Sequence, residues 1–137
     1  MSTELETSYG GVVLRGDELL VITPAGKRVT GLPKGGMEDG ESPEEVAARE
    51  VREETGVVAN VLKPLGDVRY TYRRGGRKVR KTVHFFLCEY VRGSTADHDH
   101  EVDNARWIAL SSAREALSYP GERALIERLL SKMPSGR

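Results

Sequence analysis

Three glutamates stand close together in the middle of the chain, at positions 50, 53 and 54. On a helix of 3.6 residues per turn, this i, i+3 and i+4 spacing places Glu50, Glu53 and Glu54 on one face. Like charges at this spacing repel one another, and a bound cation relieves the repulsion. Carboxylate oxygens are the ligands that hard divalent cations prefer. The spacing therefore allows a metal site, although taken alone it favours the alternative of a solvated, glutamate-rich surface helix.

Two nearby residues extend this acidic face. Arg49 lies four residues before Glu53, so a helix would bring its guanidinium beside that carboxylate and offset part of the charge. Glu41 lies just before the expected start of the helix and can fold toward the same region.

The order of these residues forms a longer motif. It reads Gly35, five residues, Glu41, seven residues, and then Arg49-Glu50-Val51-x-Glu53-Glu54-x-Gly56-Val57. This pattern matches the Nudix box, G-x5-E-x7-R-E-U-x-E-E-x-G-U with U apolar, at every specified position. The chain therefore resembles the Nudix hydrolase family, and the box itself covers residues 35–57.

The resemblance implies a fold, an activity and a metal site. The fold would be α/β, an α/β/α sandwich with a mixed β-sheet and a loop-helix-loop Nudix box, in a single domain over residues 1–137. The activity would be hydrolysis of a diphosphate linked to another group X. Glu50, Glu53, Glu54 and the backbone carbonyl of Lys34 would hold Mg²⁺ or Mn²⁺. Arg49 would orient the glutamates.

The identity of the general base stays open among three glutamates. Divalent cations neutralise a phosphoanhydride and lower the pKa of a bound water, and a glutamate then accepts the proton. Glu50 and Glu53 are candidates within the box. Glu101 is a candidate for the base and for the metal, because several Nudix enzymes place such a glutamate in a comparable loop. A solvated acidic loop is the alternative interpretation of Glu101.

Residues outside the box bear on the substrate. Lys34 belongs to a Leu-Pro-Lys-Gly-Gly lead-in, which resembles hydrolases of dinucleoside polyphosphates and of diphosphoinositol phosphates. A glycine turn at 75–76 would place Tyr70, Tyr72 and Lys81 on one sheet face, where tyrosine can stack on a base and lysine can meet phosphate. These four side chains are the predicted substrate-binding residues. The alternatives are a surface lysine and an exposed basic hairpin with core tyrosines.

The order Tyr-x-Tyr, glycine turn, Lys-Thr-Val resembles bacterial diadenosine tetraphosphate hydrolases. We therefore expect asymmetric cleavage of diadenosine polyphosphates, in which the tetraphosphate gives ATP and AMP. One alternative is a MutT-like nucleoside triphosphate pyrophosphohydrolase of the 8-oxo-dGTP type, and another is a diphosphoinositol polyphosphate phosphohydrolase. A non-catalytic nucleotide-sensing module is the alternative from another class, although such domains usually lack some of the box glutamates.

Composition narrows the class of protein and its partners. With 137 residues, of which 38% are hydrophobic and 31% charged, the chain has the make-up of one folded domain. A formal net charge of +0 gives no general attraction for polyanions. We expect a nucleotide or polyphosphate substrate, no nucleic-acid or membrane partner, and a monomer or homodimer. The single cysteine, Cys88, fits a reducing compartment and thus a cytoplasmic location.

Local patterns predict the elements that position these residues. Ser42 and Glu45 form a capping box around Pro43, which predicts a helix over 43–55 that ends at Gly56.

Strands and further helices are expected on both sides of this helix. The expected strands are 9–14, 18–23, 57–65, 68–72, 78–90 and 105–110. One late helix is expected to be capped by Ser112 and to end near Pro120, and a second to cover 122–132. Residues 1–7 and 134–137 are expected to form irregular ends.

Overall fold

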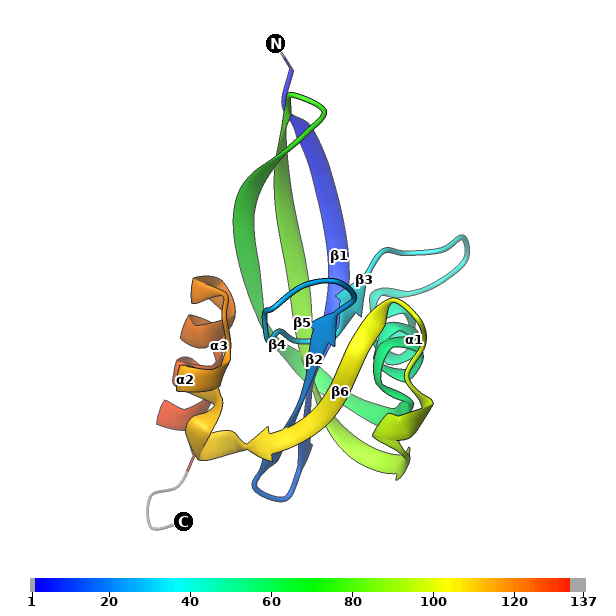
Figure 1. The fold of residues 1–137 in the computed structure, drawn as a ribbon, viewed down its shortest axis with the longest axis vertical. Coiled ribbons are helices and arrows are strands. Elements are labelled where there is room, and N and C mark those ends of the chain that lie inside the picture. Colours follow the sequence, from blue (N-terminus) through cyan, green and yellow to red (C-terminus); the bar gives the residue numbers. More distant parts are fainter. Residues whose placement is uncertain (1, 134–137) are drawn as a thin grey trace.

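A mixed β-sheet forms the centre of the molecule (Figure 1). The computed structural model describes residues 2–133. Its strands are β1 Glu4–Arg15, β2 Glu18–Pro24, β3 Lys34–Gly35, β4 Val57–Arg74, β5 Arg77–Gly93 and β6 Val102–Ala109. Their order is β4-β5-β1-β2-β6, and β3 pairs with β1. β1 and β5 run parallel, whereas the other paired strands run antiparallel.

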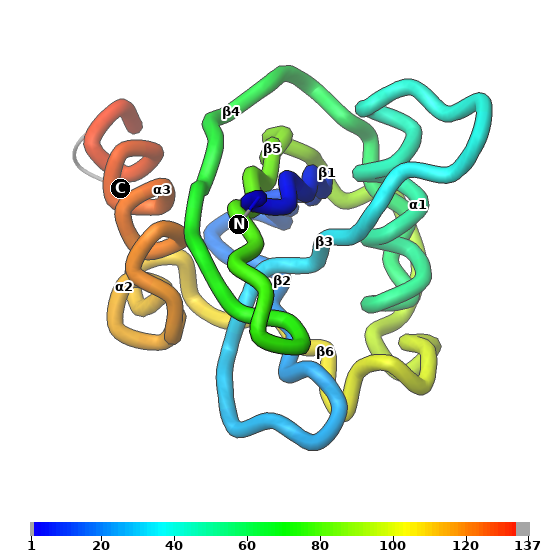
Figure 2. The backbone as a smooth tube through the Cα atoms, turned by 90° about the horizontal axis from the view of Figure 1, so that it is seen from above, coloured from blue at the N-terminus to red at the C-terminus, as the bar shows by residue number. Residues whose placement is uncertain are grey.

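Helices cover both faces of this sheet (Figure 2). They are α1 Pro43–Thr55, α2 Ala113–Ala116 and α3 Pro120–Ser131, with short 3₁₀ turns η1 Thr95–Asp97 and η2 Leu110–Ser112. α1 lies on one side of the sheet, and α2 and α3 lie on the other. The α/β/α sandwich with a mixed sheet that we expected from the sequence is therefore confirmed.

Successive residues of a strand pack into the two hydrophobic layers on opposite faces of the sheet. Side chains alternate between faces along a strand, so Phe85 packs under α3 with Leu125 and Ile126, whereas Phe86 packs under α1 with Val51. All of these side chains are buried, and each contributes roughly 1.5–3 kcal/mol through its removal from water. Cys88 belongs to the layer under α1 and is a buried free thiol.

Helix α1 forms where its capping signals predict. Ser42 accepts the backbone N–H of Glu45, and Glu45 in turn accepts the backbone N–H of Ser42, so the capping box is complete. Gly56 ends the helix with φ 80°, a left-handed conformation that only glycine adopts without strain. These boundaries set the orientation of the acidic face of α1.

The hairpin of β4 and β5 carries the predicted register. Gly75 and Gly76 form its turn, and Tyr70 pairs with Lys81 and Tyr72 with Val79.

The expectation of an irregular start is wrong for residues 4–7, which belong to β1 and pair in parallel with residues 79–82 of β5. This partner is distant in sequence, so no local pattern indicates the pairing. Residues 134–137 lie outside the described part of the chain.

Three other expectations need correction. The strands predicted at 57–65 and 68–72 are one strand, β4, whose register shifts at bulges let it continue past Pro64 and Gly66. The helix predicted after Ser112 covers only four residues. Ser112 makes no capping hydrogen bond, because it already has a helical backbone conformation at the end of η2. The last helix begins at Pro120 rather than at residue 122.

Within the described residues, no helix is both long enough and apolar enough to cross a membrane.

Candidate active site

The acidic face of α1 is organised around one guanidinium group. Arg49 donates to both oxygens of Glu41 (Nε to Oε2, 2.6 Å; Nη2 to Oε1, 2.9 Å), and its Nη1 donates to Glu50 and Glu53 at 3.1 Å each. Nη2 also donates to the carbonyl oxygen of Gly36 at 2.8 Å. The predicted contact with Glu53 and the folding back of Glu41 are confirmed. Arg49 therefore ties the loop before α1 to the glutamates on the helix.

Glu50 is the buried member of the acidic face. Only 8% of its surface is exposed, and burial, the largest effect, raises its pKa to about 7 despite the opposing influence of Arg49. Its carboxyl lies against the backbone of Gly35, where a Cβ atom would overlap it. The first glycine of the motif is thus required by the space that the Glu50 carboxyl occupies.

We predict that Gly35→Ala lowers by about 100-fold the kcat of any reaction that depends on the Glu50 carboxyl, because a displacement of about 1 Å at a reacting group costs this much. Gly36→Ala is the matched control, since a Cβ at Gly36 meets no atom within 4 Å. Steady-state kinetics of both variants test the prediction. Equal activity of the two variants would show that the position of the Glu50 carboxyl is not critical.

Glu54 faces a different neighbour from the other two glutamates. Its Oε1 accepts the backbone N–H of Lys34 at 3.0 Å, which joins α1 to β3. Burial, again the largest effect, raises the pKa of Glu54 to about 8, and the charge of Glu50 adds to the increase. Glu53 is the most exposed of the three glutamates, with 45% of its side chain accessible to solvent. The face therefore combines two carboxyl groups that burial biases toward the neutral form with one solvated carboxylate.

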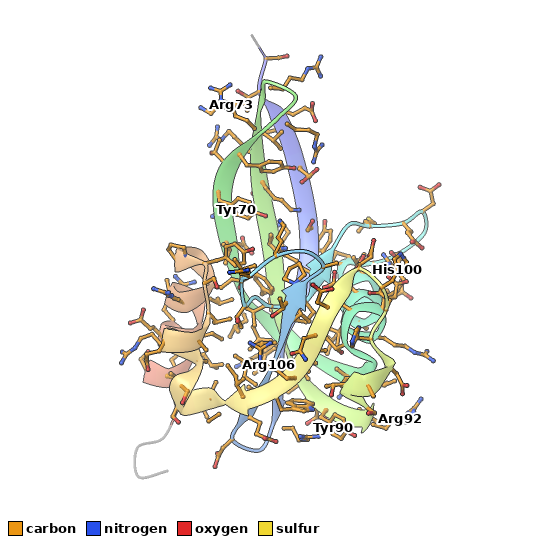
Figure 3. The ribbon with its side chains drawn as sticks, in the orientation of Figure 1. Tyr70, Arg73, Tyr90, Arg92, His100 and Arg106 are labelled. Carbon is orange, nitrogen blue, oxygen red and sulfur yellow. The ribbon has the colours of Figure 1, made fainter. Side chains whose placement is uncertain are left out.

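A cavity of about 650 Å³ opens beside this face. Glu54 and Glu101 line it, together with Lys34 and Tyr70. Burial lowers the pKa of the Lys34 ammonium. Figure 3 shows Tyr70 on the hairpin that rises above α3. The structure thus brings Glu101 to the same cavity as Glu54, although the two residues lie on different elements.

The predicted hairpin residues line the cavity, but two of them already bind another residue of the protein. Tyr70, Tyr72 and Lys81 all line it, on one sheet face as predicted. Glu6 of β1 accepts a hydrogen bond from the Tyr72 hydroxyl at 2.8 Å and forms an ion pair with Lys81 at 3.2 Å. Tyr70 is 41% exposed and makes no side-chain hydrogen bond within residues 2–133. Of the three, Tyr70 is the side chain most available to a ligand.

Glu122 is a cavity residue that the sequence analysis missed. Its side chain is only 3% exposed, its Oε1 accepts the backbone N–H of Leu32 at 3.1 Å, and it lines the same cavity. Burial, the largest effect, raises its pKa to about 7, and the charge of Lys34 opposes the increase. The signal that could have revealed it is a glutamate beside Leu125 and Ile126 on the apolar stripe of the last helix.

This carboxyl makes the stability of the protein depend on pH. The folded-state pKa is about 7 against an ordinary value of 4.5, so the stabilisation is complete below pH 4.5 and is lost as pH rises through 7. We predict that Glu122→Gln gains about 2 kcal/mol of unfolding free energy relative to the wild type between pH 5 and pH 8. Urea unfolding at both pH values measures this difference. A pH-independent difference would contradict it.

The acidic face of α1 offers oxygen donors, the kind of ligand that a hard divalent cation prefers. Glu50, Glu53 and Glu54 offer oxygen atoms, which Mg²⁺ and Mn²⁺ prefer, and burial makes the first and third unfavourable as isolated anions. Within residues 2–133, however, no group of three or more acidic, histidine or cysteine side chains is arranged so that it could hold a metal ion. Arg49 holds two of these carboxylates, so a cation would compete with the guanidinium for them.

Comparisons with known proteins agree with this geometry. The model of the NUDIX domain matches residues 5–129. The chain is 37% identical to the mutator protein MutT4 of Mycobacterium tuberculosis, over 98% of this chain and 60% of that protein. It is 34% identical to an 8-oxo-(d)GTP phosphatase of Mycolicibacterium smegmatis, over 74% of this chain and 30% of that protein. The chain thus spans 60% of the length of the first of these mycobacterial relatives and 30% of the second.

A third relative has a different named activity. The asymmetrical bis(5'-nucleosyl)-tetraphosphatase of Rattus norvegicus is 32% identical, over 69% of this chain and 65% of that protein. Among solved structures, a MutT protein from Bacillus halodurans superimposes with a TM-score of 0.77 at 21% identity, covering 91% of this chain and 82% of that chain. A hydrolase from Nitrosomonas europaea gives a TM-score of 0.76 at 21% identity, covering 93% and 90%. These structures establish the fold.

Proposed function

The chain belongs to the NUDIX domain family, and from this premise we propose that it hydrolyses a phosphoanhydride bond in a nucleoside diphosphate linked to X. The observation that carries the proposal is the meeting of two features in one place. The acidic face of α1 adjoins a cavity large enough for a nucleotide, and Glu54 and Glu101 belong to the wall of that cavity. A phosphoanhydride in the cavity would therefore lie beside carboxylates.

Glu50, Glu53 and Glu54 would hold Mg²⁺ or Mn²⁺, with the backbone carbonyl of Lys34 and the side chain of Glu101 as further ligands. A bound divalent cation would neutralise phosphate charge and lower the pKa of a water molecule. Support for this assignment comes from the hard oxygen donors and from the raised pKa of Glu50 and Glu54, because close positive charge favours their ionised form.

Other steps of the proposed reaction fall to side chains of the protein: accepting a proton, positioning the glutamates, binding phosphate and excluding water. Glu50, Glu53 or Glu101 accepts the proton of the attacking water, and the pKa of Glu50, near 7, suits a base that works at neutral pH. Arg49 positions Glu50 and Glu53 through its hydrogen bonds and is a positioning residue. Lys34 presents its ammonium to the phosphates from the cavity wall. Apolar side chains such as Val83 and Phe85 exclude water from the inner end of the cavity.

For the group X, we propose a second nucleoside, so that the preferred substrate is a diadenosine polyphosphate. The support is the position of Tyr70 and Lys34 in one cavity, which gives a stacking surface for a base and a cation for phosphate. Tyr72 and Lys81 would take part only if the ligand competes with Glu6 for them. The 32% identity to the rat asymmetrical tetraphosphatase also supports a substrate with two nucleosides.

A MutT-like triphosphate pyrophosphohydrolase is the second candidate. The buried Glu122 favours it, because a carboxyl at the inner end of a cavity can accept hydrogen bonds from the edge of a base. The identities of 37% to MutT4 and 34% to the 8-oxo-(d)GTP phosphatase point in the same direction.

Side-by-side turnover separates the two candidates. We predict that kcat/KM with Mg²⁺ is at least tenfold higher for diadenosine tetraphosphate than for 8-oxo-dGTP, with ATP and AMP as the products. Tyr70→Ala is expected to raise KM for diadenosine tetraphosphate about tenfold, because base stacking contributes roughly 1–3 kcal/mol. Faster release of pyrophosphate from 8-oxo-dGTP, with loss of that preference in Glu122→Gln, would establish the second candidate instead.

A further inference from the structure

The outer ribbon, formed by residues 4–8 of β1 and residues 67–84 of the β4-β5 hairpin, projects from the body of the molecule (Figure 1). The pairing register assigns each of its side chains to a face, because residues paired across two strands point the same way. One face, the cavity face, carries Tyr70, Tyr72 and Lys81. The opposite face, here called the basic face, carries Arg69, Arg73, Lys78 and Arg80.

The cavity face also carries Arg74 and Arg77, and two glutamates of β1 offset most of its positive charge. Arg74 and Arg77 lie directly opposite each other at the tip, an arrangement that repels. Glu6 forms an ion pair with Arg74 at 2.7 Å, and Glu4 forms one with Arg77 at 3.2 Å. Glu6 also pairs with Lys81. The arginine beside Glu6 is the main reason that the pKa of this carboxyl falls to about 2.

The basic face lacks this compensation. Arg73 lies directly opposite Lys78, again a like-charge pair. Within residues 2–133, Arg73, Lys78 and Arg80 form no ion pair, and Arg69 has only a long one of 3.5 Å with Asp67. All four side chains are exposed. The glutamates of β1 therefore offset two of the three positive charges on the cavity face. The four cations of the basic face form only the one ion pair with Asp67 within the described residues, although the whole chain is neutral.

The basic face continues toward the glutamates of α1. Gly35, Tyr9, His84 and Asp67 are paired in a row across β3, β1, β5 and β4. The rings of Tyr9 and His84 stack with centroids 5.4 Å apart, and His84 Nδ1 lies 2.7 Å from Asp67 Oδ1. The Glu50 carboxyl lies over Gly35 at the end of this row. Arg69 pairs with Thr82 in the next row of this face, which lies nearer the tip of the hairpin. Between the cations and the acidic face there is thus a partly exposed pair of aromatic rings.

This combination fits a polynucleotide better than a membrane. Phosphates of a single strand need separated cations along an extended surface, and bases need aromatic faces. The span from Arg69 to Arg73 is about 13 Å at the usual rise per residue, which exceeds a single phosphate group. Anionic lipids also attract exposed cations, but stable docking on a membrane needs buried apolar area as well, whereas this face offers the exposed Leu5 among threonines at 7, 71 and 82.

We propose that the basic face of the outer ribbon binds the phosphate backbone of a single-stranded polynucleotide. From the sequence we expected no nucleic-acid partner, because no basic surface is visible outside the hairpin of a neutral chain. The sorting of charge between the two faces of the ribbon changes that expectation. This surface is separate from the cavity, so the proposal stands whatever the substrate of the enzyme is.

The test is fluorescence anisotropy with a 3'-labelled 15-nucleotide oligouridylate that has a 5' hydroxyl, titrated with the wild-type protein at 50 to 200 mM salt. The triple variant Arg73→Glu, Lys78→Glu and Arg80→Glu is expected to weaken binding at least tenfold. The slope of log K against log salt should fall in magnitude by about 2, because each contact to a single strand contributes about 0.7. Hydrolysis of the mononucleotide or dinucleotide substrate should stay within twofold of the wild type.

A matched variant controls for total charge. Lys63→Glu, Arg92→Glu and Lys132→Glu reverses three exposed cations away from the ribbon and should change the affinity less than twofold. Circular dichroism checks that both variants fold. Three outcomes would overturn the proposal: no binding by the wild type at 50 mM salt, equal loss in the two variants, or binding to phosphatidylglycerol vesicles without binding to the oligonucleotide. None of these outcomes affects the hydrolysis measured in parallel.

Discussion

Replacing Glu50 by glutamine is expected to lower kcat about 1,000-fold while the protein remains folded. The substitution keeps the volume beside Gly35 but removes a carboxylate from the centre of the acidic face. Loss of a metal ligand or a general base usually costs 10²- to 10⁴-fold. Steady-state kinetics at saturating Mg²⁺, with the wild type in parallel, measure the effect.

The control for this variant is Glu44→Gln. Glu44 lies in the first turn of the same helix, is exposed and belongs to neither the capping box nor the Arg49 network. Its activity should stay within twofold of the wild type. If Glu50→Gln retained a tenth or more of the activity, Glu50 would be neither ligand nor base, and comparison of Glu53→Gln with Glu101→Gln would have to locate those roles.

Replacing Arg49 by alanine is expected to lower the activity that is measured with Mg²⁺. It is also expected to lower the stability of the metal-free protein. Arg49 makes hydrogen bonds to Glu41, Glu50 and Glu53, and its removal leaves these carboxylates without their counter-charge. Charged hydrogen bonds contribute roughly 1.5–3 kcal/mol each, and the exposure of Glu53 reduces its share. We expect a loss of about 2 kcal/mol in unfolding free energy and of about 100-fold in kcat.

Mg²⁺ distinguishes this explanation from simple loss of packing. If carboxylate repulsion causes the loss, 10 mM Mg²⁺ should recover part of the unfolding free energy in Arg49→Ala, as measured by urea unfolding with and without the ion. Arg52→Ala is the control, since Arg52 is exposed on the same helix and forms no ion pair within residues 2–133. A loss in Arg49→Ala that Mg²⁺ does not change would indicate a packing role.

Local signals explain why α1 and its acidic face could be predicted from sequence. The capping box at Ser42 and the left-handed cap at Gly56 fix the start and end of the helix within the chain itself. The i, i+3, i+4 spacing then fixes which side chains share a face. The hairpin register followed for the same reason, because the glycine turn determines which residues of β4 and β5 pair.

Contacts between distant segments explain what could not be predicted. The parallel pairing of residues 4–7 with β5 depends on where the sheet places two strands, and it supplies the glutamates that neutralise one face of the ribbon. Glu122 reaches the cavity only because α3 packs across the sheet and brings it to the backbone of Leu32. None of these glutamates stands in a sequence motif. The position of Glu122 on the apolar stripe of the last helix indicates burial, but only the tertiary structure shows which groups the three glutamates contact.

The central claim is that the acidic face of α1 binds a divalent cation, and calorimetric titration with Mn²⁺ tests it most directly. We expect saturable binding of Mn²⁺ to the wild type, with an affinity that is at least tenfold weaker in Glu50→Gln. We also expect tighter binding at pH 8.5 than at pH 6, with proton release, because the pKa values of Glu50 and Glu54 are about 7 and 8 before the ion binds. Binding that is absent, or that is unchanged by Glu50→Gln, would contradict the account.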